Sequence, residues 1–132
     1  MTNFQLEFSV RDYECDLEGI VNNATYLNYL EHARHEYLKT IGIDFAQMHS
    51  KGITLVVVRS EVDYKFPLKS GDKFYVTVTM ALEGKIRFVF YQDIYLIPDN
   101  KLIIKAKITG TAISQAGRPF LPDELKKLII TI

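Results

Sequence analysis

The sequence has little of several things, beginning with cysteine: Cys15 is the single one among 132 residues. One thiol cannot form an internal disulfide framework, and such usage is typical of a reducing compartment. Lysine plus arginine and aspartate plus glutamate number 16 each, so no net charge attracts nucleic acid or an anionic membrane. Residues Met1 to Arg11 lack a basic start followed by an apolar block, the mark of a signal peptide. We therefore expect a cytoplasmic protein with neither nucleic acid nor membrane as partner.

Long apolar runs and nucleotide-binding loops are also missing. The longest apolar runs, such as Ile53 to Val58, are too short to span a bilayer. The absence of a P-loop and of a G-x-G-x-x-G fingerprint disfavours nucleotide hydrolysis and dinucleotide binding. Neither His32 nor His35 stands at a metal-ligand spacing from a cysteine, an aspartate or a second histidine. The sequence therefore predicts no metal site and no cofactor.

What is present fits one α+β domain spanning residues 1–132. Apolar and polar residues alternate with the period of a strand in five segments, at Phe4–Val10, Val56–Phe66, Phe74–Leu82, Ile86–Leu96 and Leu102–Ile108. Short turns separate the last four segments, for example Ser70-Gly71-Asp72. Turns this short favour antiparallel neighbours. We therefore predict a curved antiparallel five-stranded sheet with one apolar face.

A long helix is predicted from Asn22 or Asn23 to Lys39, with one of the two asparagines as its cap. Apolar residues recur at steps of three and four, which indicates a core-facing stripe made of Tyr26, Leu27, Leu30, Ala33, Tyr37 and Leu38. Asp44 is expected to cap a short helix, and a final helix is expected over Pro122–Leu128. The sheet should wrap the long helix.

Asp16 lies shortly before the start of this helix, three residues ahead of Gly19. Glycine can take the positive φ that turns a strand sharply into a helix, so the free N–H groups of the first turn should face Asp16. Such groups can polarise a thioester carbonyl and bind the oxyanion formed on attack. Asp16 would then act as nucleophile or as general base for a water. Asp16 could equally be an ordinary turn residue, since aspartate before glycine is common in loops.

The run D-L-E-G-I-V-N-N-A-T-Y-L-N-Y-L-E-H-A-R, from Asp16 to Arg34, resembles the signature of hotdog-fold acyl-CoA thioesterases of the 4-hydroxybenzoyl-CoA type. The resemblance implies that Asp16 is catalytic and that the backbone N–H of Asn23 polarises the carbonyl. Many relatives carry Tyr-His where this chain has Asn22-Asn23, so any role of that histidine is absent here. Some hotdog enzymes take their acid from the central helix, which makes Glu31 the reserve candidate.

Several further residues are candidates for binding the substrate, an acyl group on coenzyme A or on a carrier protein. Val21, Asn22 and Tyr26 adjoin the candidate acid in the sequence. Arg59, Lys65 and Arg87 are basic residues that could bind the phosphates of coenzyme A, which is part of the substrate here and no cofactor. For any one of these cations, a solvated sheet face is the simpler interpretation.

Two further questions stay open at this level. A hotdog module that binds acyl chains without turnover is the alternative function, since fold alone does not give activity. A hydratase is disfavoured because no histidine lies between Asp12 and Thr25.

Apolar residues interrupt the polar face of the sheet, at Tyr75, Val89, Tyr91, Tyr95, Ile103 and Ile113. The resemblance implies a homodimer or homotetramer in which a partner subunit completes each site.

Overall fold

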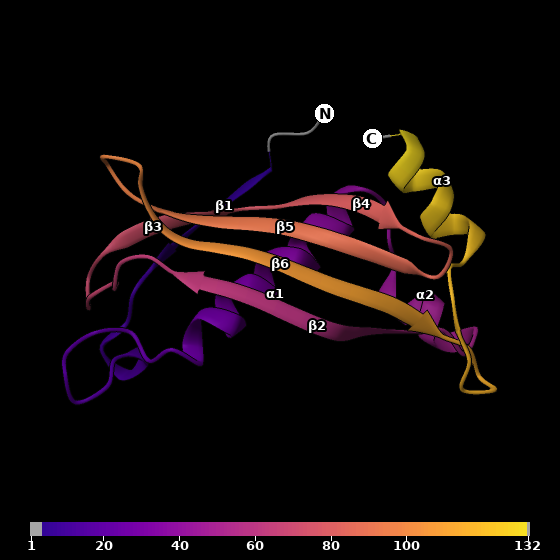
Figure 1. Ribbon diagram of the computed structural model, residues 1–132, viewed down its shortest axis with the longest axis horizontal. Helices are drawn as coiled ribbons and strands as arrows, with labels where there is room; N and C mark the ends of the chain where they lie inside the picture. Colours follow the sequence, from indigo (N-terminus) through magenta and orange to yellow (C-terminus); the bar gives the residue numbers. More distant parts are fainter. Residues whose placement is uncertain (1–3, 132) are drawn as a thin grey trace.

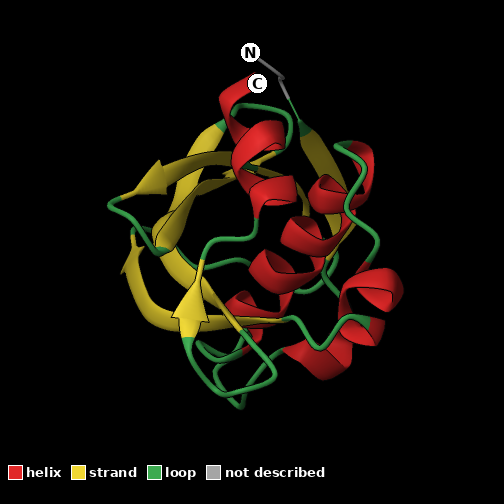
Figure 2. Ribbon diagram, turned by 90° about the vertical axis from the view of Figure 1, so that its right-hand side faces the viewer, coloured by secondary structure: helices red, strands yellow, loops and turns green. Residues whose placement is uncertain are grey.

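One antiparallel sheet curves around one long helix in the computed structural model, which describes residues 4–131 (Figures 1 and 2). The main path of the sheet runs through β1 (Gln5–Ser9), β3 (Lys73–Thr77), β5 (Arg87–Leu96), β6 (Lys101–Ile113) and β2 (Thr54–Tyr64). Two further strands extend it, because β4 (Thr79–Glu83) pairs with β5 and β7 (Pro119–Phe120) pairs with β6. The predicted class is confirmed, with seven strands where the sequence predicted five.

The helix wrapped by the sheet is α1 (Thr25–Thr40). Tyr26, Leu30 and Ala33 of the predicted stripe are buried, as are Tyr37 and Leu38. Leu27 was wrongly placed on that stripe: it is 41% exposed, and Tyr29 and Arg34 are buried in its stead. The buried face is therefore centred on Leu30 and Ala33, and Leu27 lies outside it. The side chains of Tyr29 and Arg34, which carry polar groups, therefore lie on the buried face of α1.

The start of α1 differs from the prediction in its cap. The helix begins at Thr25, and neither asparagine is its N-cap residue, which is Ala24. The Oδ1 atom of Asn22 accepts a hydrogen bond from the N–H of Ala24 at 2.9 Å, and the Asn22 carbonyl accepts from Thr25 N–H at 2.9 Å. Asn22 therefore closes an Asx turn just before the helix.

The other two helices lie near where the sequence placed them. Asp44 caps α2 (Phe45–Ser50), because its carboxylate accepts a hydrogen bond from Gln47 N–H at 3.1 Å. The last helix, α3 (Asp123–Thr131), lies against β4 and packs Leu125 into the core. None of the helices within residues 4–131 is both long enough and apolar enough to cross a membrane.

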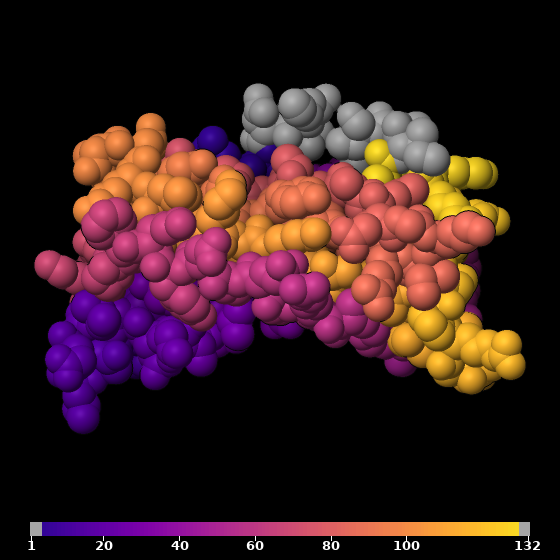
Figure 3. Space-filling view, in the orientation of Figure 1, coloured from indigo at the N-terminus to yellow at the C-terminus, as the bar shows by residue number. Residues whose placement is uncertain are grey.

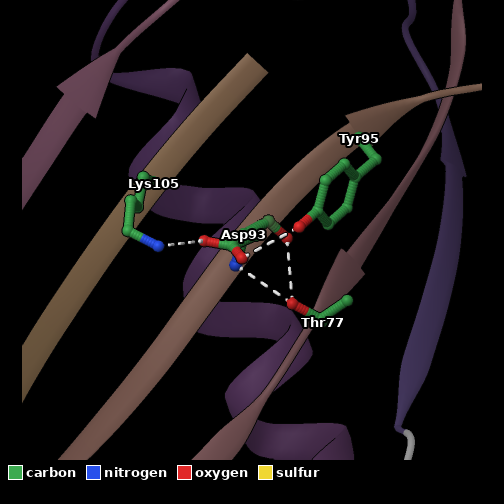
Figure 4. Close-up of polar contacts among 4 residues, drawn as sticks. All are labelled: Thr77, Asp93, Tyr95 and Lys105. Atoms are coloured by element: carbon green, nitrogen blue, oxygen red, sulfur yellow. Dashed lines mark hydrogen bonds and ion pairs between the residues drawn. The ribbon is translucent and has the colours of Figure 1, made fainter. Parts of the chain in front are cut away.

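The predicted strand Phe74–Leu82 is divided into β3 and β4 by the side chain of Thr77. Its hydroxyl accepts a hydrogen bond from the Asp93 N–H at 3.1 Å, where a backbone carbonyl would accept in an uninterrupted ladder (Figure 4). Asp93 also pairs with Lys105 at 3.8 Å and accepts from the Tyr95 hydroxyl at 3.1 Å. Val78, at the break, stays fully buried, so the inward alternation is unaffected.

A register shift in the pairing of β5 with β6 changes the position of one apolar residue. The pairing steps from Ile94 opposite Ile104 to Tyr95 opposite Leu102, which leaves Ile103 as the extra residue. Ile103 is fully buried in the core, so its assignment to the polar face was wrong. A bulge of this kind re-aims one side chain and cannot be read from alternation.

Strand β2 is a free edge of the sheet. It pairs with β6 on one side, and among residues 4–131 nothing pairs with its other side. Its middle and end are solvent-exposed, including Val57 and Tyr64 at 50% each. Figure 3 shows that the lower border of the molecule, where β2 lies, is hollowed between the loop before α1 and the turn after β6. Natural sheets usually cover or blunt such an edge.

Candidate functional site

The loop that carries Asp16 is a tight turn closed by backbone hydrogen bonds. Asp16 N–H donates to the Ile20 carbonyl at 2.8 Å, and Gly19 N–H donates to the Asp16 carbonyl at 3.0 Å. Gly19 has a φ of 80°, which confirms the predicted left-handed turn. The Oδ1 atom of Asp16 accepts from Glu18 N–H at 2.8 Å. This hydrogen bond orients the carboxylate and leaves its Oδ2 atom available.

Glu14 attaches this loop to α1. Its side chain accepts a hydrogen bond from the Tyr29 hydroxyl at 2.8 Å, and its carbonyl accepts from Asn22 N–H at 3.0 Å. Arg11 adds a backbone hydrogen bond of 2.8 Å and an ion pair of 3.3 Å to the same carboxylate. Burial, and then the hydrogen bond to Glu14, raise the pKa of Tyr29, so its proton stays in place as donor. The loop and the helix start therefore hold a fixed relative position.

Asp16 borders a cavity of about 350 Å³, which we call the Asp16 cavity. It is lined by Asp16, Ile20, Val21, Asn23, Tyr26, Tyr64, Lys65, Phe66 and Pro67. Five of these were candidate site residues in the sequence: Asp16, Val21, Asn23, Tyr26 and Lys65. Ile20, in the loop itself, was not singled out. Tyr64, Phe66 and Pro67 were missed because the end of β2 and the residues after it approach the start of α1 only in the folded chain.

Two tyrosines brace the entrance of α1 beside Asn23. Tyr64 donates a hydrogen bond from its hydroxyl to the Asn23 carbonyl at 3.2 Å. Tyr26 accepts at its hydroxyl from Leu68 N–H at 2.9 Å, and burial raises the pKa of Tyr26. In the described part of the chain, no hydrogen bond uses the N–H of Asn23. The cavity is therefore lined by Asp16 and by Asn23, a residue whose backbone N–H has no partner among residues 4–131.

Five candidate residues do not line the Asp16 cavity, and one of them, Gly19, shapes the turn described above. The Asn22 side chain is exposed and bound to Ala24, so Asn22 belongs to the turn. Arg59 is exposed in the middle of β2, where it pairs with Glu61 at 3.5 Å. Arg87 begins β5 at the end of the sheet opposite the Asp16 loop, next to the β4–β5 turn (Figure 1). Glu31 lines a different cavity. Within one chain, the candidate site residues therefore do not all lie at one site.

The second cavity, of about 490 Å³, lies between α1, α2 and the first half of β2, and we call it the Arg34 cavity. It is lined by Glu31, Arg34, His35, Leu38, Phe45, His49, Ile53, Thr54, Leu55, Val56, Val57, Phe88 and Phe90. Arg34 is only 8% exposed, and Gln92 beside it is 1% exposed. Burial lowers the pKa of the Arg34 guanidinium, and the negative charge of Glu31 acts in the opposite direction.

Arg34 and Gln92 form a buried polar pair that the sequence analysis missed. The Nη1 atom of Arg34 donates to Oε1 of Gln92 at 3.0 Å, and Nε2 of Gln92 donates to the Leu30 carbonyl at 3.0 Å. A signal existed in the sequence: Gln92 interrupts the inward alternation of Phe88, Phe90 and Ile94. Within residues 4–131, no group of three or more His, Cys, Asp or Glu residues could hold a metal ion.

Comparison with known proteins identifies the family. Residues 10–129 match the family model described as the thioesterase-like superfamily. The chain belongs to this superfamily. It is 34% identical to the acyl-acyl carrier protein thioesterase ATL3 of Arabidopsis thaliana, over 96% of this chain and 67% of that one. It is also 34% identical to the long-chain acyl-CoA thioesterase FadM of Escherichia coli, over 83% of this chain and 82% of that one.

The fold comparison agrees with the family. A 1,4-dihydroxy-2-naphthoyl-CoA thioesterase from Synechocystis superposes with a TM-score of 0.89 and 21% identity, over 99% of this chain and 98% of that one. This likeness and the family model confirm the hotdog fold. The family model and the thioesterase relatives confirm the enzyme class, a thioester hydrolase. The chain spans 61% of the length of a second Arabidopsis relative, ATL2. The narrower 4-hydroxybenzoyl-CoA type stays a prediction.

Proposed function

We propose that the chain hydrolyses an acyl thioester in the Asp16 cavity, with Asp16 as the catalytic acid residue and the Asn23 N–H as the donor to the thioester carbonyl. The observation that carries this proposal is that Asp16 and Asn23 line the same cavity, and that no hydrogen bond within residues 4–131 uses the Asn23 N–H. A donor at the start of a helix also benefits from the positive end of the helix dipole. It binds the oxyanion of the transition state more strongly than the ground-state carbonyl.

Asp16 can act by either of two routes. As nucleophile, a carboxylate oxygen bonds to the carbonyl carbon, the thiolate leaves, and water then cleaves the resulting anhydride. As general base, the carboxylate takes a proton from a water that attacks the carbonyl directly. In both routes the Glu18 N–H holds Oδ1 and leaves Oδ2 to react. The proposed substrate is an acyl group on coenzyme A or on a carrier protein, and the proposed location is the cytoplasm.

We further propose that two copies pair through β2 to form a homodimer, on which a tetramer could be built. If Ser60 lies opposite the partner's Ser60 in an antiparallel pair, Arg59 lies opposite the partner's Glu61. The edge is therefore self-complementary in charge, as a two-fold interface requires. β2 carries a bulge between Val57 and Arg59. To within that one-residue irregularity, the same register brings Val56, which lines the Arg34 cavity, to the partner's Tyr64, which lines the Asp16 cavity.

This pairing supports one composite site from the two cavities. The Asp16 cavity of one subunit would adjoin the Arg34 cavity of its partner, at each end of the paired strands. Arg87 precedes Phe88, which lines the Arg34 cavity, and Lys65 lines the Asp16 cavity. Both cations could then bind phosphates of coenzyme A at one substrate site. Glu31 would likewise lie near the partner's Asp16 cavity.

The test is a thiol-release assay with short, medium, long-chain and aromatic acyl-CoAs, and with acyl carrier protein thioesters. We expect Asp16→Asn to lose roughly 10²–10⁴-fold in kcat. The side chain is nearly isosteric, so the melting temperature should stay within a few degrees of the wild type. Glu31→Gln is the matched control and should lose far less.

Two results would contradict the proposal. Full turnover by Asp16→Asn would remove Asp16 from the chemistry, and a larger loss in Glu31→Gln would move the chemistry to the helix. Silence of the wild type on the whole panel would favour the alternative, a hotdog module that binds acyl groups without hydrolysing them.

A further inference from the structure

Arg34 is a buried cation whose hydrogen-bonding capacity is largely unused. Its guanidinium carries five N–H donors, and Gln92 is its one hydrogen-bond partner among residues 4–131. No ion pair in the described part of the chain includes Arg34. A buried charge without a close counter-charge or a full set of acceptors is costly, so the spare donors of Arg34 favour a ligand that can accept hydrogen bonds from them.

Gln92 fixes where the guanidinium points. Both ends of its amide are bonded, one to Arg34 and the other to the Leu30 carbonyl. The guanidinium carbon of Arg34 also lies 5.8 Å from the centre of the Phe90 ring, a second wall residue of the cavity. The strand and the helix thus hold Arg34 in one orientation. Arg34 itself lines the Arg34 cavity.

The rest of that wall is mostly apolar. Phe45, Leu55 and Phe88 are representative of it, and Glu31 is the one carboxylate among the lining residues. An apolar cavity with a few placed polar groups suits a mainly apolar ligand that carries one polar function. A neutral oxygen fits better than a carboxylate, because a second carboxylate would face the negative charge of Glu31. A hydroxyl could accept from Arg34 and donate to Glu31.

We propose that the Arg34 cavity holds the acyl group of the substrate, and that Arg34 donates a hydrogen bond to a hydroxyl or oxo oxygen carried by that group. This inference rests on the proposed function, since it concerns the acyl group whose thioester the partner's Asp16 would attack. Arg34 is then a specificity-determining residue, and Gln92 is the residue that positions it. The enzyme distinguishes oxygenated acyl chains from plain chains of equal length.

The test compares kcat/KM for decanoyl-CoA with kcat/KM for decanoyl-CoAs that carry one hydroxyl or oxo group near the thioester, at mid-chain or at the far end. At least one oxygenated substrate should be preferred by about tenfold or more, the size of one hydrogen bond to a charged group. Arg34→Met should bring this ratio to about one. Arg34→Lys should keep part of the preference. Arg118→Met, an exposed cation outside both cavities, is the control.

The ratio of the two kcat/KM values separates a loss of recognition from a loss of folded protein, because a loss of folded protein lowers both kcat/KM values alike. An equal rate for all chains, or a preference that survives Arg34→Met, would overturn the proposal. A preference for decanedioyl-CoA alone would also overturn it, in favour of a carboxylate ligand. Calorimetric binding of the same thioesters to Asp16→Asn, with and without Arg34→Met, gives the same comparison without turnover. Failure of the inference is thereby distinguished from failure of the proposed hydrolysis.

Discussion

The two ends of β2 border cavities of different construction. The Asp16 cavity depends on a short exposed loop, closed by hydrogen bonds between residues two to four apart, such as Glu18 to Asp16 and Gly19 to Asp16. The Arg34 cavity depends on a buried pair, Arg34 and Gln92, that joins a helix to a strand 58 residues away. The first arrangement suits a reactive group that must meet solvent and substrate. The second suits a group that recognises an unchanging part of a ligand.

The largest expected effect comes from separating the Asp16 cavity of one subunit from the Arg34 cavity of its partner. Arg59→Glu would place like charges opposite each other on both sides of the centre of the proposed β2 pairing, and like-charge contacts across an interface cost several kcal/mol. We expect Arg59→Glu to shift the protein from dimer to monomer in sedimentation velocity and to lose most hydrolysis. Each subunit would still contain both of its cavities.

The double variant Arg59→Glu/Glu61→Arg is the matched control. It restores opposite charges in the same register, so dimer and activity should both return. A single variant Arg59→Glu that stays dimeric and active would show that β2 is not the contact.

A smaller effect is expected from Gly110→Ala, at the end of β2 that borders the Arg34 cavity. A Cβ atom on Gly110 would lie 2.5 Å from Cε1 of Phe88 and 2.9 Å from the Val56 carbonyl oxygen, and both residues line the Arg34 cavity. Overpacking of this kind costs about 1–3 kcal/mol in unfolding free energy. Denaturant unfolding should show that loss, and the preference for acyl-chain length should change because the Phe88 ring must move.

Gly19→Ala is the matching substitution in the loop that borders the Asp16 cavity. Nothing lies within 4 Å of the added Cβ, and its cost comes from the positive φ, about 1–2 kcal/mol. It should lower kcat without changing the preference for chain length. Equal changes of chain-length preference in both variants would mean that catalysis and acyl-chain selection do not belong to separate cavities.

The smallest effect concerns the attachment of the Asp16 loop. Tyr29→Phe removes the hydrogen bond to Glu14 and should cost about 1–2 kcal/mol at neutral pH. The pKa of Tyr29 is raised in the folded state, so its contribution is complete below the ordinary tyrosine pKa of 10.0 and is lost as the pH rises above it. The stability difference between wild type and Tyr29→Phe should therefore shrink above pH 10.0. A difference that is constant across this range would mean that Tyr29 is not protected from ionisation.

The sequence predicts those parts of the molecule that local pattern determines. Alternation located the strands, and the Asp16 to Gly19 spacing located a turn that the φ of Gly19 confirms. The division of a strand at Thr77 and the burial of Ile103 were not predictable, because each depends on contacts with a neighbouring strand. The same holds for the site. Spacing placed Asp16 near the helix start, the resemblance pointed to Asn23, and both residues line the Asp16 cavity. The position of Arg87 away from both emerges only from the path of the sheet.

The central claim is that a working site combines the Asp16 cavity of one subunit with the Arg34 cavity of its partner. Its most direct test mixes two inactive variants, Asp16→Asn and His35→Trp, the second of which fills the mouth of the Arg34 cavity from the exposed face of α1. After subunit exchange, each mixed dimer keeps one intact composite site. The account predicts recovery of about a quarter of the wild-type rate, because half of the dimers are mixed and each has one of two sites intact. A mixture no more active than the sum of its two parents would contradict it.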